Sequence, residues 1–453
     1  MKVIIAGCGK VGKTILQSMI KEKHEVLVLD SDAKVIKDTT NEFDVIGLCG
    51  SGTSYADLKE AGVDKAELFI AVTASDELNM LSCYIAKKLG ANHTVARIRN
   101  ADLTGDNLEF IKQSLELNMV INPELLTAKV IHDIIKLPSV TKVESFASGA
   151  FEMLELSVKN DCAIIGLPLI ELRKKLQEKF LVLAIQRGEE VFIPNGQSTI
   201  ANGDKICVIA SIQDVQRLLK SFGFLSKPIR DVMIIGASKT SLYLSKLLSV
   251  GNTSVKIIEK SQDKCLLASE TLDNKVMIIN GDGMSQEVLK EEGIDGAGAF
   301  VALTGEDEEN ILMSFYASKQ NTEKVITKVN RNELLSISEN LGLDTIVSPK
   351  KAVADVLTSY ARALENTIGS KIETLYTVMN GVVEVAEFKV LPDFSLTGKL
   401  IKDLPIKANV LIAGIVRNGI SIIPGGFDEI KEGDGVIIVS SSESISDLED
   451  IVK

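Results

Sequence analysis

Three glycines near the start of the chain have the spacing of a phosphate-binding turn. Gly7, Gly9 and Gly12 lie in "AGCGKVGK", directly after the strand pattern "KVIIA" and at the start of an amphipathic stretch. In a G-x-G-x-x-G turn the first glycine permits the bend, the second lets a phosphate approach the backbone, and the third lets the helix pack closely on the strand. The free N–H groups and the dipole of the helix N-terminus then favour the phosphate. The other residues of this predicted loop are Cys8, Lys10 and Val11.

A carboxylate follows at the place where a bound ribose needs a hydrogen-bond acceptor. Asp30 ends the next strand pattern, "EVLVLD". A carboxylate there accepts hydrogen bonds from the ribose diol and repels a 2′-phosphate. The pattern therefore predicts NAD(H) or an adenine nucleotide (ATP, ADP or AMP) rather than NADP. The alternative for the loop alone is a tight turn that binds no ligand.

Polar residues are also predicted at the carboxyl ends of two later strands. Thr73 ends the strand in "AVTASDELN", beside the reversal of strand order where open α/β sheets hold ligands. Ser75 is predicted to cap the helix that follows. Arg97 ends the fifth strand, where its guanidinium either reaches bound phosphates or forms an ion pair at the domain surface.

The predicted site occurs twice, because the chain is an internal duplication. Residues 50–88 and 281–319 align without a gap and share 18 identities in 39 positions. A shared repeat of this length means that both halves have the same fold. The join between them lies near 222–231.

The second copy of the loop has lost two of its three glycines. Gly236 is retained, but Ser238 and Ser241 stand at the second and third positions. Side chains there would crowd a pyrophosphate and loosen the packing of helix on strand. The second copy therefore predicts a weaker site, for a mononucleotide or with only a structural role. That weaker site comprises Gly236, Glu259 and Lys328, which correspond to Gly7, Asp30 and Arg97.

Each half alternates β-rich runs with amphipathic stretches and then changes to short strands joined by tight turns. This order predicts an α/β fold, in which a Rossmann-like parallel-sheet domain is followed by a small α+β module and the pair is duplicated in tandem. The predicted domains are a Rossmann domain at 1–146, a small module at 147–225, a second Rossmann domain at 229–371 and a second small module at 372–453.

Composition limits the classes of function. The net charge of −12 disfavours nucleic acid as a partner. No apolar run approaches the roughly 18 residues of a membrane helix, so we expect any action at a membrane to go through a partner. The six cysteines are scattered, as in a reduced cytosolic protein, and Cys8 is expected to be partly accessible.

The histidines do not indicate catalysis. His24, His93 and His132 lie beside no plausible nucleophile and in no metal-ligand spacing, so we expect them at the surface. No metal is inferred, and no Walker-type loop is present.

These residues resemble a known family. The loop "GCGKVG", Asp30, "AVTASDELN", "ARIRN" and "INPE", followed by a small α+β module, are similar to the RCK (KTN) domain. Two such units in one chain resemble the TrkA-type peripheral subunits of Trk potassium uptake systems, with TrkA-N and TrkA-C domains. In that family the glycine loop and the acidic residue hold the nucleotide, which implies Gly7, Gly9, Gly12 and Asp30 here. The family commonly has Gly-Asp after the third strand, but this chain has Gly50-Ser51 in the first half.

The resemblance implies a function in regulation. It predicts a cytoplasmic, non-enzymatic subunit that self-associates into a gating ring, lies at the inner face of the cell membrane and controls a membrane-embedded Trk-type potassium transporter subunit. Bound nucleotide would set the conformation, with hinges near 136–140 and 361–371. The alternative is an NAD-dependent dehydrogenase, because the first glycine loop alone does not exclude one.

Overall fold

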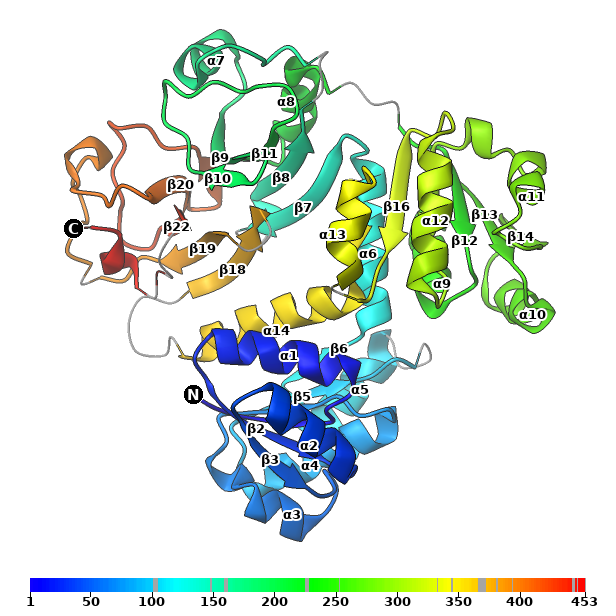
Figure 1. Cartoon of the computed structure of the whole chain (residues 1–453). Helices are drawn as coiled ribbons and strands as arrows, with labels where there is room; N and C mark the ends of the chain where they lie inside the picture. Colours follow the sequence, from blue (N-terminus) through cyan, green and yellow to red (C-terminus); the bar gives the residue numbers. More distant parts are fainter. Residues whose placement is uncertain are drawn as a thin grey trace.

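The two halves of the chain fold into the same pair of sheets. The computed structural model shows, within its described residues, two six-stranded parallel sheets, each followed along the chain by a five-stranded sheet (Figure 1). This confirms the predicted α/β fold and its duplication. The structure describes residues 1–452 except for 101–104, 147–148, 159–161, 225–227, 252, 332, 344, 366–371, 380–381, 393, 442–444 and 446.

The first Rossmann domain is built around strands that are buried on both faces. In β1 (Lys2–Ala6) and β4 (Leu68–Ala71) nearly every residue is buried, as in a parallel sheet covered by helices on both sides. The strand order is β3-β2-β1-β4-β5-β6, so the order reverses between β1 and β4. The other elements are α1 (Lys10–Lys21), β2 (Glu25–Asp30), α2 (Ala33–Glu42), β3 (Ile46–Cys49), α3 (Tyr55–Glu60), η1 (Val63–Lys65), α4 (Asp76–Leu89), β5 (His93–Arg97), α5 (Gly105–Ser114), β6 (Met119–Ile121) and α6 (Pro123–Lys136).

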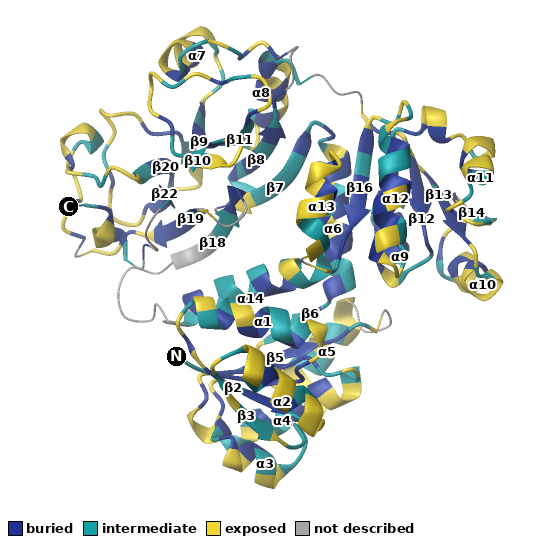
Figure 2. Cartoon of the chain, in the orientation of Figure 1, coloured by how far each residue is buried: buried dark blue, intermediate teal, exposed yellow. Residues whose placement is uncertain are grey.

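The second Rossmann domain repeats this order as β14-β13-β12-β15-β16-β17. Figure 2 shows the central strands of both domains mostly in dark blue, as buried residues, whereas the outer faces of the helices are largely yellow, as exposed residues. The elements are β12 (Asp231–Ile235), α9 (Lys239–Ser249), β13 (Ser254–Glu259), α10 (Gln262–Thr271), β14 (Val276–Asn280), α11 (Gln286–Glu291), η3 (Ile294–Gly296), β15 (Ala299–Ala302), α12 (Asp307–Ser318), β16 (Lys324–Lys328), α13 (Glu333–Asn340), β17 (Ile346–Val347) and α14 (Pro349–Glu365).

The small modules are antiparallel sheets with the strand orders β10-β9-β11-β8-β7 and β18-β19-β22-β20-β21. The first contains β7 (Val140–Phe146), β8 (Phe151–Ser157), α7 (Leu169–Lys175), β9 (Phe180–Arg187), β10 (Glu190–Phe192), β11 (Lys205–Ser211) and α8 (Val215–Phe222). The second contains β18 (Ile372–Val378), β19 (Val383–Lys389), η5 (Ile401–Asp403), β20 (Val410–Arg417), β21 (Ile420–Ile422), β22 (Gly435–Ser440) and η6 (Leu448–Ile451).

One predicted domain boundary needs correction. Strand β7 pairs with β8 from Val140 to Phe146, so it belongs to the sheet of the small module and not to the Rossmann domain predicted at 1–146. The predicted boundary fell after this segment instead of before it, because its sequence, VTKVESF, does not show which sheet it joins. The other boundaries stay predictions, and 366–371, at the end of the second Rossmann domain and within the predicted hinge at 361–371, lie outside the described residues.

The two Rossmann domains exchange their last helices. Helix α6 follows the first sheet in sequence but packs on α9, where Ile131, Ile134 and Ile135 join the core of the second domain. Helix α14 in turn packs on α1, where Val353 and Leu357 join the core of the first domain. Figure 1 shows α14 lying along α1 between the first Rossmann domain and the rest of the molecule. Each Rossmann domain is thus completed by the other half of the chain.

The two small modules also share a core. Phe146 and Phe151 of the first module lie in one buried cluster with Val385 and Val439 of the second. The aromatic rings of Phe146 and Tyr376 meet edge to face, with 4.8 Å between their centroids. No helix among the described residues is both long enough and apolar enough to cross a membrane.

Candidate nucleotide-binding site

The first glycine loop has the shape that a phosphate requires. Gly7 has a φ of +102°, and a Cβ there would lie 2.8 Å from the backbone nitrogen of Thr73. A Cβ on Gly12 would lie 1.9 Å from the carbonyl oxygen of Gly7, so helix α1 needs glycine to approach β1 this closely. A Cβ on Gly9 would meet no described atom within 4 Å, and no described side chain caps α1. The amides at the start of α1 therefore face open space beside Gly9.

The Asp30 carboxylate is held against this loop. Its Oδ2 accepts a hydrogen bond from the backbone N–H of Cys8 (2.7 Å), and its Oδ1 accepts one from the N–H of Asp32 (3.0 Å). A carboxylate has about four lone-pair sites, so about two remain for a ribose diol. Sequence and structure thus place Asp30 and the glycine loop together, as the predicted site needs.

A buried asparagine that sequence reasoning missed organises the next edge of the site. Asn79 Oδ1 accepts hydrogen bonds from the N–H (2.8 Å) and the hydroxyl (2.7 Å) of Thr73, and its Nδ2 donates to the carbonyl of Arg97 (2.9 Å). Asn310 makes the same contacts with Thr304 and Lys328 in the second domain. An asparagine stands at this position of an amphipathic helix in both repeats. A comparison of the two repeats could therefore have identified it.

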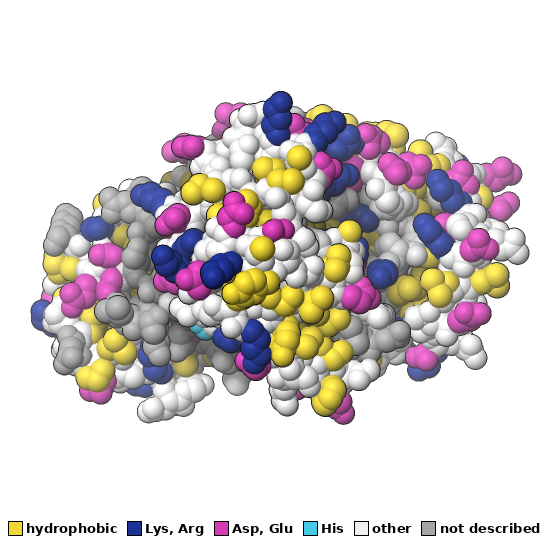
Figure 3. Space-filling view, turned by 90° about the horizontal axis from the view of Figure 1, so that it is seen from below, with side chains coloured by type: hydrophobic (Ala, Val, Ile, Leu, Met, Phe, Trp, Pro, Cys, Tyr) yellow, Lys and Arg dark blue, Asp and Glu magenta, His cyan; other side chains and the backbone are white. Residues whose placement is uncertain are grey.

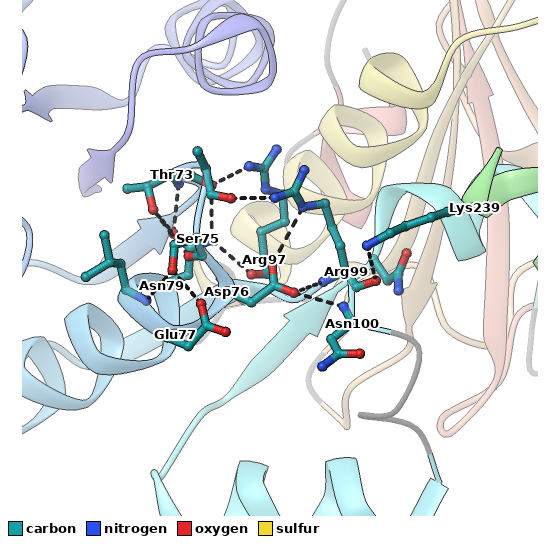
Figure 4. Close-up of polar contacts among 12 residues, drawn as sticks. Thr73, Ser75, Asp76, Glu77, Asn79, Arg97, Arg99, Asn100 and Lys239 are labelled. Carbon is teal, nitrogen blue, oxygen red and sulfur yellow. Dashed lines mark hydrogen bonds and ion pairs between the residues drawn. The ribbon is translucent and has the colours of Figure 1, made fainter. Parts of the chain in front are cut away.

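Arg97 lies deeper than its sequence position indicates. Its side chain is buried, and its Nη2 donates to the carbonyl of Thr73, as the dashed line between them in Figure 4 marks. Its Nε has no hydrogen-bond partner among the described atoms. Burial, and then the charge of Arg99, hold the pKa of the Arg97 guanidinium below its ordinary value. An anion beside it would relieve this cost of burial.

The structure bears on three further predictions about the first domain. Ser75 does cap α4, where its Oγ accepts from the N–H of Leu78 at 3.2 Å. Cys8 is not accessible, because only 2% of the residue is exposed and its thiol packs into the core behind the loop. Burial raises the pKa of the Cys8 thiol to about 12, so Cys8 can contribute its backbone but not a thiolate. The expected surface position of His24 was also wrong, since His24 is buried.

The second glycine loop has a different local structure. Gly236 keeps a φ of +93°. Ser238 caps α9, with its Oγ accepting from the N–H of Ser241 at 3.3 Å. The Ser241 hydroxyl donates to the carbonyl of Gly236 at 2.6 Å. The Glu259 carboxylate accepts from the N–H of Ala237 at 2.8 Å, as Asp30 does from Cys8. A cavity of about 190 Å³ is lined by Gly236, Ser238 and Glu259 together with residues of the loop after β15 and of α12.

Lys328, the third residue of the predicted second site, does not line that cavity. It lines a larger cavity of about 560 Å³ between the two Rossmann domains, which also includes Lys10, Val11 and Arg97 of the first domain. Lys239 of α9 reaches this region too, where its Nζ lies 3.5 Å from the carbonyl of Arg99 (Figure 4). The start of the first glycine-loop helix therefore opens toward a cavity that six basic and four acidic side chains line, with both signs of charge from both domains. Burial lowers the pKa of Lys328.

The sequence of the chain matches known proteins over its whole length. The model of the TrkA-N domain matches 3–123 and 232–349, and that of the TrkA-C domain matches 153–223 and 385–453. A Trk system potassium uptake protein TrkA homolog of Archaeoglobus fulgidus is 31% identical over 455 residues, which cover 100% of both chains. The Trk system potassium uptake protein TrkA of Azorhizobium caulinodans is 26% identical over 459 residues, which cover 100% of this chain and 99% of that protein.

Solved structures share the fold. The crystal structure of the GsuK RCK domain has a TM-score of 0.64 at 16% identity and covers 97% of this chain and 92% of its own. The GsuK channel bound to NAD has the same TM-score and identity, over 97% of this chain and 77% of that one. The duplicated Rossmann and small modules, the full-length matches and the two family models agree, and the chain belongs to the TrkA family of Trk system potassium uptake proteins.

Proposed function

We propose that the chain is a nucleotide-binding regulatory subunit of a Trk-type potassium uptake system, and that it acts on a separate membrane-embedded subunit rather than as an enzyme. The observation that carries this proposal is the N-terminus of α1 beside Gly9, which no described side chain caps, with the Asp30 carboxylate facing the same loop. Free helix amides favour a phosphate, and a carboxylate at the end of β2 favours a ribose diol. The ligand would be NAD(H) or an adenine nucleotide.

The proposed binding residues of the first domain lie around two connected features. Gly7, Cys8, Gly9 and Gly12 form the loop with Asp30, and Thr73 closes the next strand end. Lys10, Val11 and Arg97 instead line the cavity between the Rossmann domains. Basic residues outnumber acidic ones in its lining by six to four, so a phosphate at the start of α1 would lie near a cavity with an excess of cationic groups, including Lys239 and Lys328. The buried Nε of Arg97, which has no described partner, fits such an anion.

This position gives the ligand a physical route to the rest of the molecule. A ligand shifts a conformational equilibrium only if it binds one arrangement more tightly than the other. Contacts at an interface between two domains depend on their relative position, so a phosphate there distinguishes arrangements. Helix α6 leads from this interface through Leu137–Ser139 into β7 of the small module, within the predicted hinge at 136–140. Domain movement would therefore reach the small modules.

The comparisons support this proposal for the nucleotide and for the partner. A channel with the same fold binds NAD, and another form of that channel binds ADP. Relatives that match the whole chain are potassium uptake proteins, which supports a transporter subunit as the partner and the cytoplasmic side of the cell membrane as the location.

Self-association into a ring is also part of the proposal. Leu78, Leu81 and Phe110 of the first Rossmann domain are between 46% and 69% exposed, and Leu312, the counterpart of Leu81, is 57% exposed. Figure 3, which faces the first Rossmann domain from below, shows hydrophobic side chains gathered between charged ones. Apolar side chains exposed at equivalent places on two repeats fit contacts between copies of the chain.

Regulation can be measured directly. We expect potassium flux into liposomes that contain the membrane subunit of the system to change when this protein and NADH, NAD, ATP or ADP are added together. The same lipid vesicles with protein but without nucleotide are the control. Flux that is the same with every nucleotide and without any would contradict ligand-dependent regulation.

Asp30→Ala should weaken binding of the active nucleotide by about 1–3 kcal/mol, because a charged acceptor for the ribose diol is lost. Asp30→Asn keeps an oxygen acceptor for the Cys8 amide and should lose less. Calorimetric titration measures both, and circular dichroism checks that each variant is folded. Affinity that is unchanged in a folded Asp30→Ala protein would remove Asp30 from the site.

The competing dehydrogenase function makes an opposite prediction. If the protein is a regulatory subunit and does not reduce carbonyl compounds, NADH should stay unoxidised in the presence of a broad panel of carbonyl substrates. The measurement is the absorbance of the reduced nicotinamide over time. Saturable NADH consumption that disappears in the Asp30→Ala variant would favour the dehydrogenase instead.

A further inference from the structure

The cavity of the second Rossmann domain has a different charge from the matching positions of the first. It is lined by the carboxylates of Glu259, Asp282, Glu306 and Glu309. The corresponding residues of the first half are Asp30, Ser51, Ser75 and Leu78. Four acidic side chains therefore line the second cavity, whereas only one stands at the matching positions of the first half. An anionic ligand is disfavoured there, because like charges at short range repel.

Two lysines in the same lining offset this charge only in part. Lys260 and Lys264 replace Ser31 and Val35 of the first half. The Lys260 ammonium lies 3.7 Å from the Glu309 carboxylate and is 68% exposed, so it is already paired and largely in water. Four carboxylates against two ammonium groups leave a net negative cavity.

At the start of α9, where a phosphate would bind, a side chain already caps the helix. In the first domain no described side chain caps α1, but in the second Ser238 caps α9 by accepting from the N–H of Ser241. The Ser238 and Ser241 hydroxyl oxygens lie 2.9 Å apart, and Ser241 donates onward to the Gly236 carbonyl. A phosphate would have to displace this hydrogen-bonded cap before it could reach the helix amides.

The part of the cleft that recognises a nucleoside is retained. Glu259 is 6% exposed and lines the cavity, and the amides of Ala237 and Ser261 hold its two carboxylate oxygens at 2.8 and 2.9 Å. Lone pairs remain on this carboxylate for a ribose diol. Asp282 adds an acceptor for an exocyclic amino group, and Met284 and Met313 add apolar surface for a base.

We propose that this second cleft binds a nucleoside with no 5′-phosphate, whose 5′ substituent is neutral or cationic. The inference rests on the proposed function, in which the first Rossmann domain holds a nucleotide, and it assigns the second domain a different ligand class. The first cleft takes the anionic nucleotide, and the second takes a nucleoside held by Glu259 and Asp282. Such a protein would bind two classes of ligand at once, an anionic nucleotide and a nucleoside without a 5′-phosphate.

Calorimetric titration of the full chain with adenosine, AMP and NAD tests this assignment. We expect adenosine to bind one site at least about tenfold more tightly than AMP binds that site. Glu259→Gln should weaken adenosine binding and leave NAD binding intact, whereas Asp30→Ala should do the reverse. Replacing Glu306 and Glu309 by glutamine should reduce the preference for adenosine over AMP by about tenfold, because two repelling charges are removed. Both carboxylates lie near the surface, so this variant does not depend on a buried group.

The results separate this inference from the proposed function. Absence of adenosine binding, adenosine binding that ignores Glu259→Gln, or AMP binding as tight as adenosine at a Glu259-dependent site would each overturn the inference. Each of these leaves the proposed function in place if NAD still binds in an Asp30-dependent way. NAD binding that ignores Asp30→Ala counts against the proposed function, whatever adenosine does.

Discussion

Arg362→Ala should lower the free energy of unfolding by about 3–4 kcal/mol, the largest effect we expect from a single substitution in this chain. The Arg362 guanidinium of α14 donates through Nη2 to Glu22 Oε1 at the end of α1 (2.6 Å) and to Glu384 Oε1 of β19 (3.2 Å). Its side chain is only 9% exposed, and those of the two glutamates are 13% and 18% exposed. Alanine would remove the guanidinium charge from beside two nearly buried carboxylates.

The consequence extends beyond local stability. Arg362 joins the first Rossmann domain, the exchanged helix α14 and the second small module, so its loss should loosen α14 from α1. Circular dichroism in urea measures the stability, since the chain has no tryptophan for fluorescence. Hydrogen exchange of the α1 and α14 amides locates the effect.

The other half of the chain supplies the control for Arg362. Lys136 occupies the equivalent place at the end of α6 but is exposed. Lys136→Ala should change stability by less than about 0.5 kcal/mol. Equal losses from the two variants would show that the buried ion pairs of Arg362 do not stabilise the junction.

Gly12→Ser should destabilise the first Rossmann domain by about 3 kcal/mol and abolish its nucleotide binding. The new Cβ would fall 1.9 Å from the carbonyl oxygen of Gly7, which is backbone and cannot turn away. Helix α1 would have to move from β1, and the amides at its start would move with it. Urea denaturation and calorimetric titration with NAD measure the two effects.

Gly9→Ser is the matched variant, because we expect it to weaken nucleotide binding without destabilising the fold. Its Cβ would meet no described atom within 4 Å, so stability should change little while a phosphate is blocked and the helix gains a capping hydroxyl. Ser241→Gly should not by itself restore tight binding to the second domain, since Ser238 still caps α9. A Gly12→Ser protein that binds NAD normally would show that close packing of α1 is not required.

Much of the site could be predicted because its residues are close in sequence or at strand ends. The glycine spacing and the position of Asp30 at a strand end predict that the loop and this carboxylate lie together, because the carboxyl ends of adjacent parallel strands lie at one edge of a sheet. Asn79 was missed because a polar residue in an amphipathic helix does not differ in pattern from a solvated one. Its repetition as Asn310 marks the position, and its buried contacts with Thr73 and Arg97 show what it does there.

The sequence by itself determined the duplication, the parallel sheets and the loss of two glycines in the second half, because repeat identity, strand patterns and glycine spacing are local properties. The tertiary structure alone decided the rest. It showed that α6 and α14 are exchanged, that β7 belongs to the small module, and that Lys328 lies between the Rossmann domains rather than in the second cleft. The physical reason is that an apolar helix face predicts burial but not the partner against which it is buried. Because the chain has two equivalent Rossmann domains, each such face could pack on either of them.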